Sequence, residues 1–192
     1  MIAVFIHGGG WAHGGSTFDI YNGTELVAAS VQQKQPVIYV NFNYRLGIFG
    51  FLGGKDMKAA DAAGTAALNA GYWDQVAALQ FIQNNIASFG GDPKNVVIWG
   101  QSAGASSVGA LLLANGGKAA SGLFSKAILE SGSPQLRVVT EGSASACAIA
   151  YLVLPLQIPA ICPHGKSATT AVQRSPPVDI MHFVRLLAAR ID

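Results

Sequence analysis

The pentapeptide Gly100–Gly104, with the sequence G-Q-S-A-G, constrains the fold of this chain more than any other feature. A β-branched apolar run at 95–100 leads into it, and a helix-compatible run at 103–114 leads out. A serine at such a strand–turn–helix junction sits on a sharp bend that raises its hydroxyl above the sheet. The flanking glycines remove side chains that would collide with that bend. We therefore predict that Ser102 is a nucleophile at the N-terminus of a helix.

A second glycine-rich motif supports this interpretation. The apolar run Ile2–Ile6 reads as a buried strand, and it leads directly into the sequence H-G-G-G-W at 7–11. Glycines in this position leave backbone N–H groups free for an anion, as in an esterase oxyanion hole. Both motifs follow predicted strands, whose carboxyl ends form the edge where open α/β sheets build their sites. The alternative is that 8–10 is only a tight turn and Ser102 only caps a helix, but two motifs in the right context favour a site.

The order of predicted elements indicates an α/β fold with a mostly parallel sheet and crossover helices. Further strands are expected at 37–43 and 126–130. We expect Asp74 to cap a helix whose apolar stripe runs from 76 to 89. The Ala/Gly-rich segment at 55–65 is expected to be a surface loop.

Six short blocks of sequence, at 4–11, 43–52, 69–75, 89–93, 99–105 and 127–134, follow one another in a familiar order. In this order they resemble the type-B carboxylesterases and lipases, the cholinesterase-like branch of the α/β-hydrolase fold. Gln101 stands where the family usually has glutamate, as in a fungal form. The resemblance implies hydrolysis of small-molecule carboxylic esters through an acyl-enzyme, with no cofactor.

The resemblance also implies roles for individual residues. Ser102 would be the nucleophile, and the backbone N–H groups of Gly9, Gly10 and Ala103 would form the oxyanion hole. Arg45 and Asp74 would form a structural ion pair. The residues expected to support the site, without acting as catalysts, are His7, Gly100, Gln101, Gly104 and Ser131. Trp11 and Phe49 would either line a substrate pocket or belong simply to the core.

The other members of a catalytic triad are not assigned. In this fold an acid and then a histidine follow the serine. The acids after Ser102 are Glu130, Glu141, Asp179 and Asp192, and the histidines are His164 and His182. Neither histidine lies in a segment that resembles the family's histidine loop. Both are expected to be solvated tail residues, with a role as substitute base as the weaker alternative.

The family pattern stops at residue 135. We therefore predict a partial α/β-hydrolase domain at 1–135 and an atypical tail at 136–192, the result of a frame error, a retained intron or an alternative end. The tail has an uncharged run at 142–163, but three prolines and Gln157 make it a poor membrane span. An amphipathic helix is expected at 180–191.

Composition narrows the class of protein further. The 192 residues carry a net charge of only +2, which does not suggest a nucleic-acid partner, and two cysteines define neither a disulfide framework nor a metal site. The first residues contain no secretory signal, so the localisation is unknown and we expect the N-terminus to be missing. That would leave Ile2–Ile6 near a sheet edge. Two functions remain open: an ester hydrolase, or an inactive fragment whose oxyanion hole binds acyl or carboxylate groups.

Overall fold

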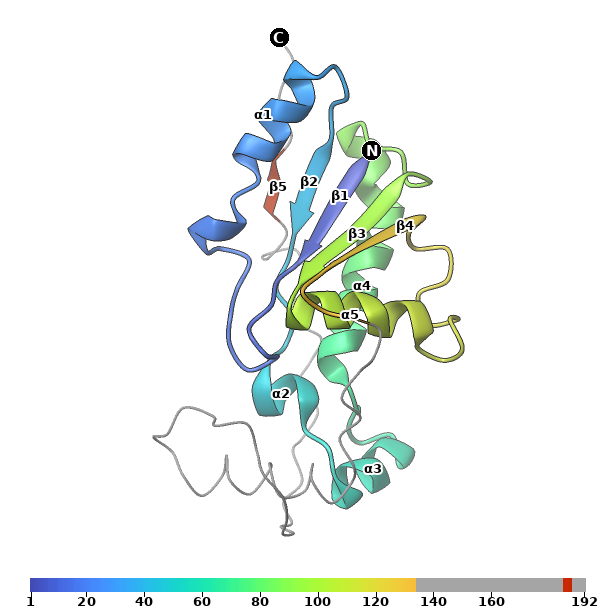
Figure 1. Cartoon of the computed structure of the whole chain (residues 1–192). Helices are drawn as coiled ribbons and strands as arrows, with labels where there is room; N and C mark the ends of the chain where they lie inside the picture. The colour runs from blue at the N-terminus through green and yellow to red at the C-terminus, as the bar shows by residue number, and fades with distance from the viewer. Residues whose placement is uncertain (134–184, 188–192) are drawn as a thin grey trace.

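The protein is described by a computed structural model that covers residues 1–133 and the backbone of 185–187. Its sheet has five strands in the order β4-β3-β1-β2-β5 (Figure 1). The first four strands pair in parallel, and β5 pairs with β2 in the antiparallel direction. The strands are β1 (Ile2–Ile6), β2 (Ile38–Asn41), β3 (Val96–Gln101), β4 (Lys126–Glu130) and β5 (Arg185–Leu187).

Helices cover both faces of this sheet, α1 on one face and α4 and α5 on the other (Figure 1). Crossover helices of this kind are what a parallel sheet requires, so the predicted α/β class is confirmed. The helices are α1 (Thr24–Gln32), α2 (Gly47–Phe51), α3 (Lys55–Ala62), α4 (Ala70–Asn85) and α5 (Ala103–Leu113), with 3-10 turns η1 (Asp19–Tyr21) and η2 (Ile86–Phe89).

The core explains why β1 is apolar at every position. Ile2, Val4 and Ile6 face the cluster that contains the apolar stripes of α4 and α5. Phe5 faces the other way and packs with Val27 of α1. All residues of β1 are therefore buried, as expected for a parallel strand covered on both faces.

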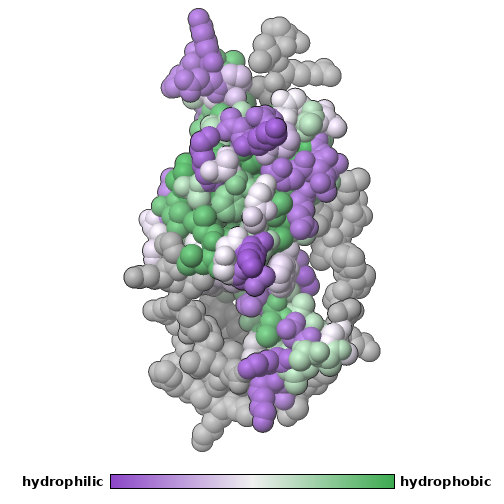
Figure 2. Space-filling model, turned by 90° about the vertical axis from the view of Figure 1, so that its right-hand side faces the viewer, coloured by the Kyte–Doolittle hydropathy of each residue, from purple (hydrophilic) through white to green (hydrophobic). Residues whose placement is uncertain are grey.

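The position of β1 corrects one expectation. It lies in the middle of the sheet, between β3 and β2, and not near an edge. Its register pairs Ile6 with Gly100, so the chain leaves β1 and β3 at the same edge of the sheet. Among the described strands, β4 forms an outer edge, and its residue Ile128 is half exposed. Figure 2 shows apolar surface on this side of the molecule.

Three local predictions are wrong. The helix expected to begin at Asp74 begins at Ala70, because Asn69 adopts a left-handed conformation and its carbonyl accepts the first helical N–H groups. The segment 55–65 is mostly helix α3, since its alanines favour helix between two glycine boundaries. Within the expected helix at 180–191, residues 185–187 form β5 instead, because the free edge of β2 offers backbone partners. The rest of that range lies outside the described residues.

The helices α1 and α2 were not predicted from the sequence. Only one residue of each is buried, Val27 in α1 and Gly50 in α2. Within the described part of the chain, no helix combines the length and the apolarity needed to span a bilayer.

Candidate active site

Ser102 occupies a strained bend between β3 and α5. Its φ is 55° and its ψ is −121°, outside the regions that L-residues favour. Such a conformation costs of order 1–3 kcal/mol and persists only where the surroundings hold it. Two backbone hydrogen bonds do so: the Ser102 N–H donates to the Glu130 carbonyl at 2.9 Å, and the Ser102 carbonyl accepts the Ser106 N–H at 3.0 Å. The predicted strand–turn–helix geometry is therefore present.

The glycines around the bend are required by close backbone approaches. A β-carbon on Gly100 would collide with the backbone of Gly104, and one on Gly104 would collide with the carbonyl of Ile6. A β-carbon on Gly132 would lie 2.8 Å from the Ser102 carbonyl. These contacts let α5 begin directly against the ends of β1 and β4.

The glycine turn after β1 lies against Ser102. A β-carbon on Gly8 would be 3.2 Å from the Ser102 Cβ and 2.6 Å from the Gln101 carbonyl oxygen. The two sequence motifs, at 7–11 and 100–104, thus meet at the carboxyl ends of adjacent strands. This is the edge at which both were expected.

Hydrogen bonds fix the directions of the N–H groups in the turn. In a trans peptide the C=O and the following N–H point in opposite directions, and no cis peptide occurs among the described residues. The Gly8 carbonyl accepts the His7 Nδ1–H at 2.8 Å, so the Gly9 N–H points the other way. The Gly9 carbonyl accepts the Ala12 N–H at 3.1 Å, which orients the Gly10 N–H in the same manner.

The third expected donor, the Ala103 N–H, is oriented by the same rule. Its peptide unit is held at the Ser102 carbonyl, which accepts the Ser106 N–H. The recorded bonds among residues 1–133 include none donated by the N–H groups of Gly9, Gly10 or Ala103. The bonds on the preceding carbonyls therefore fix the direction of all three N–H groups.

His7 is a buried support and not a solvent-exposed base. It is 1% exposed, and its ring stacks on Tyr44 with centroids 4.6 Å apart. The Tyr44 hydroxyl donates to the His7 carbonyl at 2.8 Å. Burial lowers the pKa of His7 below its usual value, although the bond to the Gly8 carbonyl opposes this shift. At neutral pH the ring is uncharged, with Nδ1 carrying the proton that the Gly8 carbonyl accepts.

The remaining expected residues are placed as follows. Gln101 is half-buried, and its side-chain oxygen lies 3.1 Å from a β-carbon position on Gly8. Ser131 has a φ of 53° and is exposed directly after β4. No hydrogen bond from Ser131 is recorded within residues 1–133, where the carbonyl of the preceding Glu130 makes the link to Ser102. Phe49 is 75% exposed on α2, so it does not belong to the core.

Arg45 and Asp74 form the expected ion pair. Two side-chain hydrogen bonds of 2.7 Å join the guanidinium to both carboxylate oxygens, and the Arg45 N–H adds a third at 2.9 Å. The hydrogen bond to Asp74 raises the pKa of Arg45. The pair ties the segment after β2 to the N-terminal half of α4.

A family profile described as the carboxylesterase family matches residues 2–152. The chain belongs to the carboxylesterase family. The match runs beyond residue 135, and the boundary placed there remains a prediction.

Named relatives of this carboxylesterase chain include lipase 2 of Geotrichum candidum, which is 46% identical over 136 residues, 69% of this chain and 23% of the relative. Para-nitrobenzyl esterase of Bacillus subtilis is 42% identical over 151 residues, 79% of this chain and 28% of the relative. A solved PNB esterase structure matches with a TM-score of 0.67 at 42% identity, covering 81% of this chain and 30% of that one. The chain thus spans about a quarter of the length of these two curated relatives.

The acid and base of a carboxylesterase triad are not found among the described residues. Within residues 1–133, the Ser102 hydroxyl makes no recorded hydrogen bond, and the histidines there are His7 and His13. Glu130 contributes only its backbone carbonyl to the site. No cluster of metal-ligating side chains occurs in this part of the chain. The candidates that lie outside the described residues are Glu141, Asp179, Asp192, His164 and His182.

Sequence reasoning missed three polar residues that support the carboxylesterase site. The Tyr44 hydroxyl donates to the His7 carbonyl, and the buried side chain of Gln75 in α4 donates to the Ser107 hydroxyl in α5. Tyr44 and Gln75 stand inside two of the family-like blocks, at 43–52 and 69–75. Their place in these blocks was the signal that could have found Tyr44 and Gln75, whereas Ser107 lies outside the blocks.

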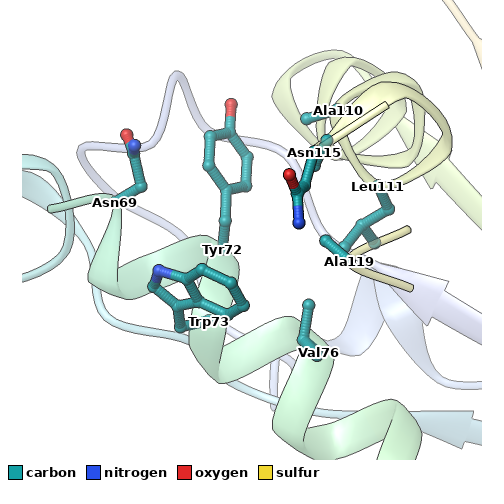
Figure 3. A pocket seen from close by; sticks show the side chains of 9 residues that line it. Asn69, Tyr72, Trp73, Val76, Ala110, Leu111, Asn115 and Ala119 are labelled. Carbon is teal, nitrogen blue, oxygen red and sulfur yellow. The ribbon is translucent and has the colours of Figure 1, made fainter. Parts of the chain in front are cut away.

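A cavity of about 320 Å³ lies between α4 and the far end of α5 (Figure 3). Tyr72 and Trp73 form one wall, and Leu111 and Asn115 form the other. None of the predicted site residues lines it, so it is separate from the region around Ser102.

Proposed function

We propose that this chain carries the nucleophile and the oxyanion hole of a carboxylic ester hydrolase that acts through an acyl-enzyme. The observation that carries the proposal is the approach of Gly8 to Ser102, which places the glycine turn against the bend. Ser102 and the amides of Gly9, Gly10 and Ala103 are then the acting groups. The substrate class is small-molecule carboxylic esters.

In the proposed reaction the Ser102 hydroxyl oxygen attacks the ester carbonyl carbon, and a base takes the hydroxyl proton. The carbonyl oxygen becomes an oxyanion that accepts hydrogen bonds from the three amides. Each such donor contributes roughly 10² to 10³ in rate. The tetrahedral adduct loses the alcohol, which takes up the proton, and water then releases the carboxylic acid. The described residues supply no base at the Ser102 hydroxyl.

A fluorophosphonate probe tests the proposal on the full chain. We expect phosphonylation at Ser102, located by peptide mass spectrometry, and its loss in Ser102→Ala. Labelling spread over other serines, or unchanged total labelling in Ser102→Ala, would contradict the proposal. Hydrolysis of a short-chain nitrophenyl ester that disappears in Ser102→Ala would show complete turnover.

A second candidate function is binding without turnover. It is favoured by the absence, among residues 1–133, of a histidine bonded to the Ser102 hydroxyl. An oxyanion hole without a base retains only small residual catalysis. Slow labelling confined to Ser102, together with no measurable ester turnover, would favour this alternative.

A further inference from the structure

The buried Ser107 hydroxyl links the glycine turn at 7–11 to the first turn of α5. It donates to the Ala103 carbonyl at 2.8 Å, in the first turn of α5. It accepts the Trp11 indole N–H at 3.1 Å and the Gln75 amide N–H at 3.3 Å. A hydroxyl offers one donor and two acceptor positions, so all of its hydrogen-bonding capacity is used.

The two ends of this link adjoin the groups proposed to hold the oxyanion. Trp11 follows Gly10 directly in the chain, and Ala103 is itself a donor residue. Ser107 is fully buried, so water does not compete for these bonds. The bond from Trp11 therefore ties the glycine turn to the helix that begins at Ser102.

The glycine turn needs such a tie because it ends on Trp11, whose backbone is strained. Gly9 and Gly10 have φ values of 111° and 63°, and Trp11 continues the left-handed stretch with 59°. A residue with a β-carbon rarely adopts this conformation unless its surroundings hold it. Two contacts hold Trp11: its indole bond to Ser107, and its carbonyl, which accepts the Gly47 N–H at 2.6 Å.

Gln75 completes the arrangement from α4. Its side chain is fully buried, and its amide N–H fills the second acceptor position of Ser107. The Gln75 side-chain oxygen has no recorded partner among the described residues. Gln75 thus fixes the direction in which the Ser107 hydroxyl points, toward the Ala103 carbonyl.

We propose that Ser107 is a positioning residue that, through the Trp11 indole, sets the distance between the glycine turn and Ser102. This inference rests on the proposed function, since the turn is taken to supply the oxyanion donors. Ser107 touches no reacting atom. Its effect is on the placement of the Gly9 and Gly10 amides relative to the Ala103 amide.

Trp11→Phe removes the indole N–H while keeping an aromatic ring, and Ser107→Ala removes the hydroxyl. The matched control is Trp99→Phe, because the Trp99 indole N–H is buried without a recorded partner in the described part of the chain. For each full-length variant, the fluorophosphonate reaction at Ser102 is separated into a maximal rate and a half-saturating concentration. Urea unfolding of each variant verifies that it is folded.

We expect the maximal labelling rate to fall roughly tenfold or more in Trp11→Phe, with little change in half-saturating concentration, since misplacement by about 1 Å costs up to 10²-fold. Ser107→Ala should show the same loss, and the double variant should lose no more than either single one. Trp99→Phe should react like the wild type. A rate within twofold of wild type in folded Trp11→Phe, or additive losses in the double variant, would overturn the inference.

Hydrogen–deuterium exchange of the peptide that contains residues 7–13 gives a readout that does not need a reactive serine. Faster exchange is expected there in Trp11→Phe and Ser107→Ala, and not in Trp99→Phe. If wild type is not labelled at Ser102, the proposed function fails, and exchange alone decides the role of Ser107. Equal exchange in wild type and both variants would then overturn it.

Discussion

Gly104 at the start of α5 lies directly against the carbonyl of Ile6 at the end of β1, with no room for a β-carbon between them. The partner is the backbone of the central strand and cannot move aside like a flexible side chain. We therefore predict that Gly104→Ala destabilises the fold by about 3 kcal/mol, the upper part of the range for overpacked sites. Urea unfolding monitored by tryptophan fluorescence measures this change.

Gly15→Ala is the control for this prediction. A β-carbon on Gly15 would make only ordinary contacts, the nearest at 3.5 Å to the Asn43 side-chain oxygen. We expect the Gly15→Ala midpoint to stay close to wild type. Equal midpoints for Gly104→Ala and wild type would show that α5 does not abut β1 as described.

Gly8→Ala tests whether the glycine turn contributes to the reaction at Ser102. The added methyl group would press on the Gln101 carbonyl and the Ser102 Cβ, and it would push the glycine turn away from the bend. We predict a fall of roughly 10²-fold in the rate of phosphonylation at Ser102, as for a misplacement of about 1 Å. The half-saturating concentration should change little. Labelling at the wild-type rate would mean that the turn does not contribute to the reaction.

His7 predicts a pH dependence of stability. Burial lowers its pKa in the folded state below the value of 6.5 that it has when unfolded, so the unfolded chain binds more protons between these two values. The contribution of neutral His7 is therefore complete above pH 6.5 and is lost as the pH falls toward the folded-state pKa. Urea midpoints at pH 7.5 and 5.5 should differ more for wild type than for His7→Gln. An equal decline in both proteins would contradict the buried, neutral state of His7.

The Arg45–Asp74 pair predicts a loss of stability on removal of one charge. Asp74→Asn keeps the shape of the side chain, but it removes the negative charge and replaces one accepting oxygen with an NH2 group, which cannot accept a hydrogen bond from the guanidinium. Because both side chains are partly exposed, we expect a cost of about 1–2 kcal/mol in the free energy of unfolding. Arg45→Lys, which keeps the charge but loses the planar fork, should also be destabilised. Wild-type stability of Arg45→Lys would indicate that the two-pronged geometry contributes nothing.

The sequence predicts the sheet and the backbone of the site because these depend on local patterns. The continuous apolar run of β1 indicates a buried strand. The glycines around Ser102 and in the glycine turn indicate close backbone approaches. The pair Arg45–Asp74 came from family resemblance, and the structure confirms it. The start of α4 was wrong because Asn69 begins the helix from a left-handed conformation, which no periodic pattern reveals.

The hydrogen bonds of the supporting residues Gln75 and Ser107 could not be predicted, because they depend on contacts between segments far apart in the sequence. Ser107 reads as an ordinary helix residue, and only packing shows that Trp11 and Gln75 both bond to its hydroxyl. The edge strand β5 was missed for a related reason. Its pairing depends on the free edge of β2 and not on the alternation of its own residues.

The most direct test of the account is a crystal structure of the chain phosphonylated by a fluorophosphonate, in which the phosphoryl oxygen stands for the oxyanion of the tetrahedral adduct. We predict phosphorus bonded to the Ser102 Oγ, with the phosphoryl oxygen about 3 Å from the backbone nitrogens of Gly9, Gly10 and Ala103. A phosphoryl oxygen directed into solvent, with the glycine turn too far away to donate, would contradict it.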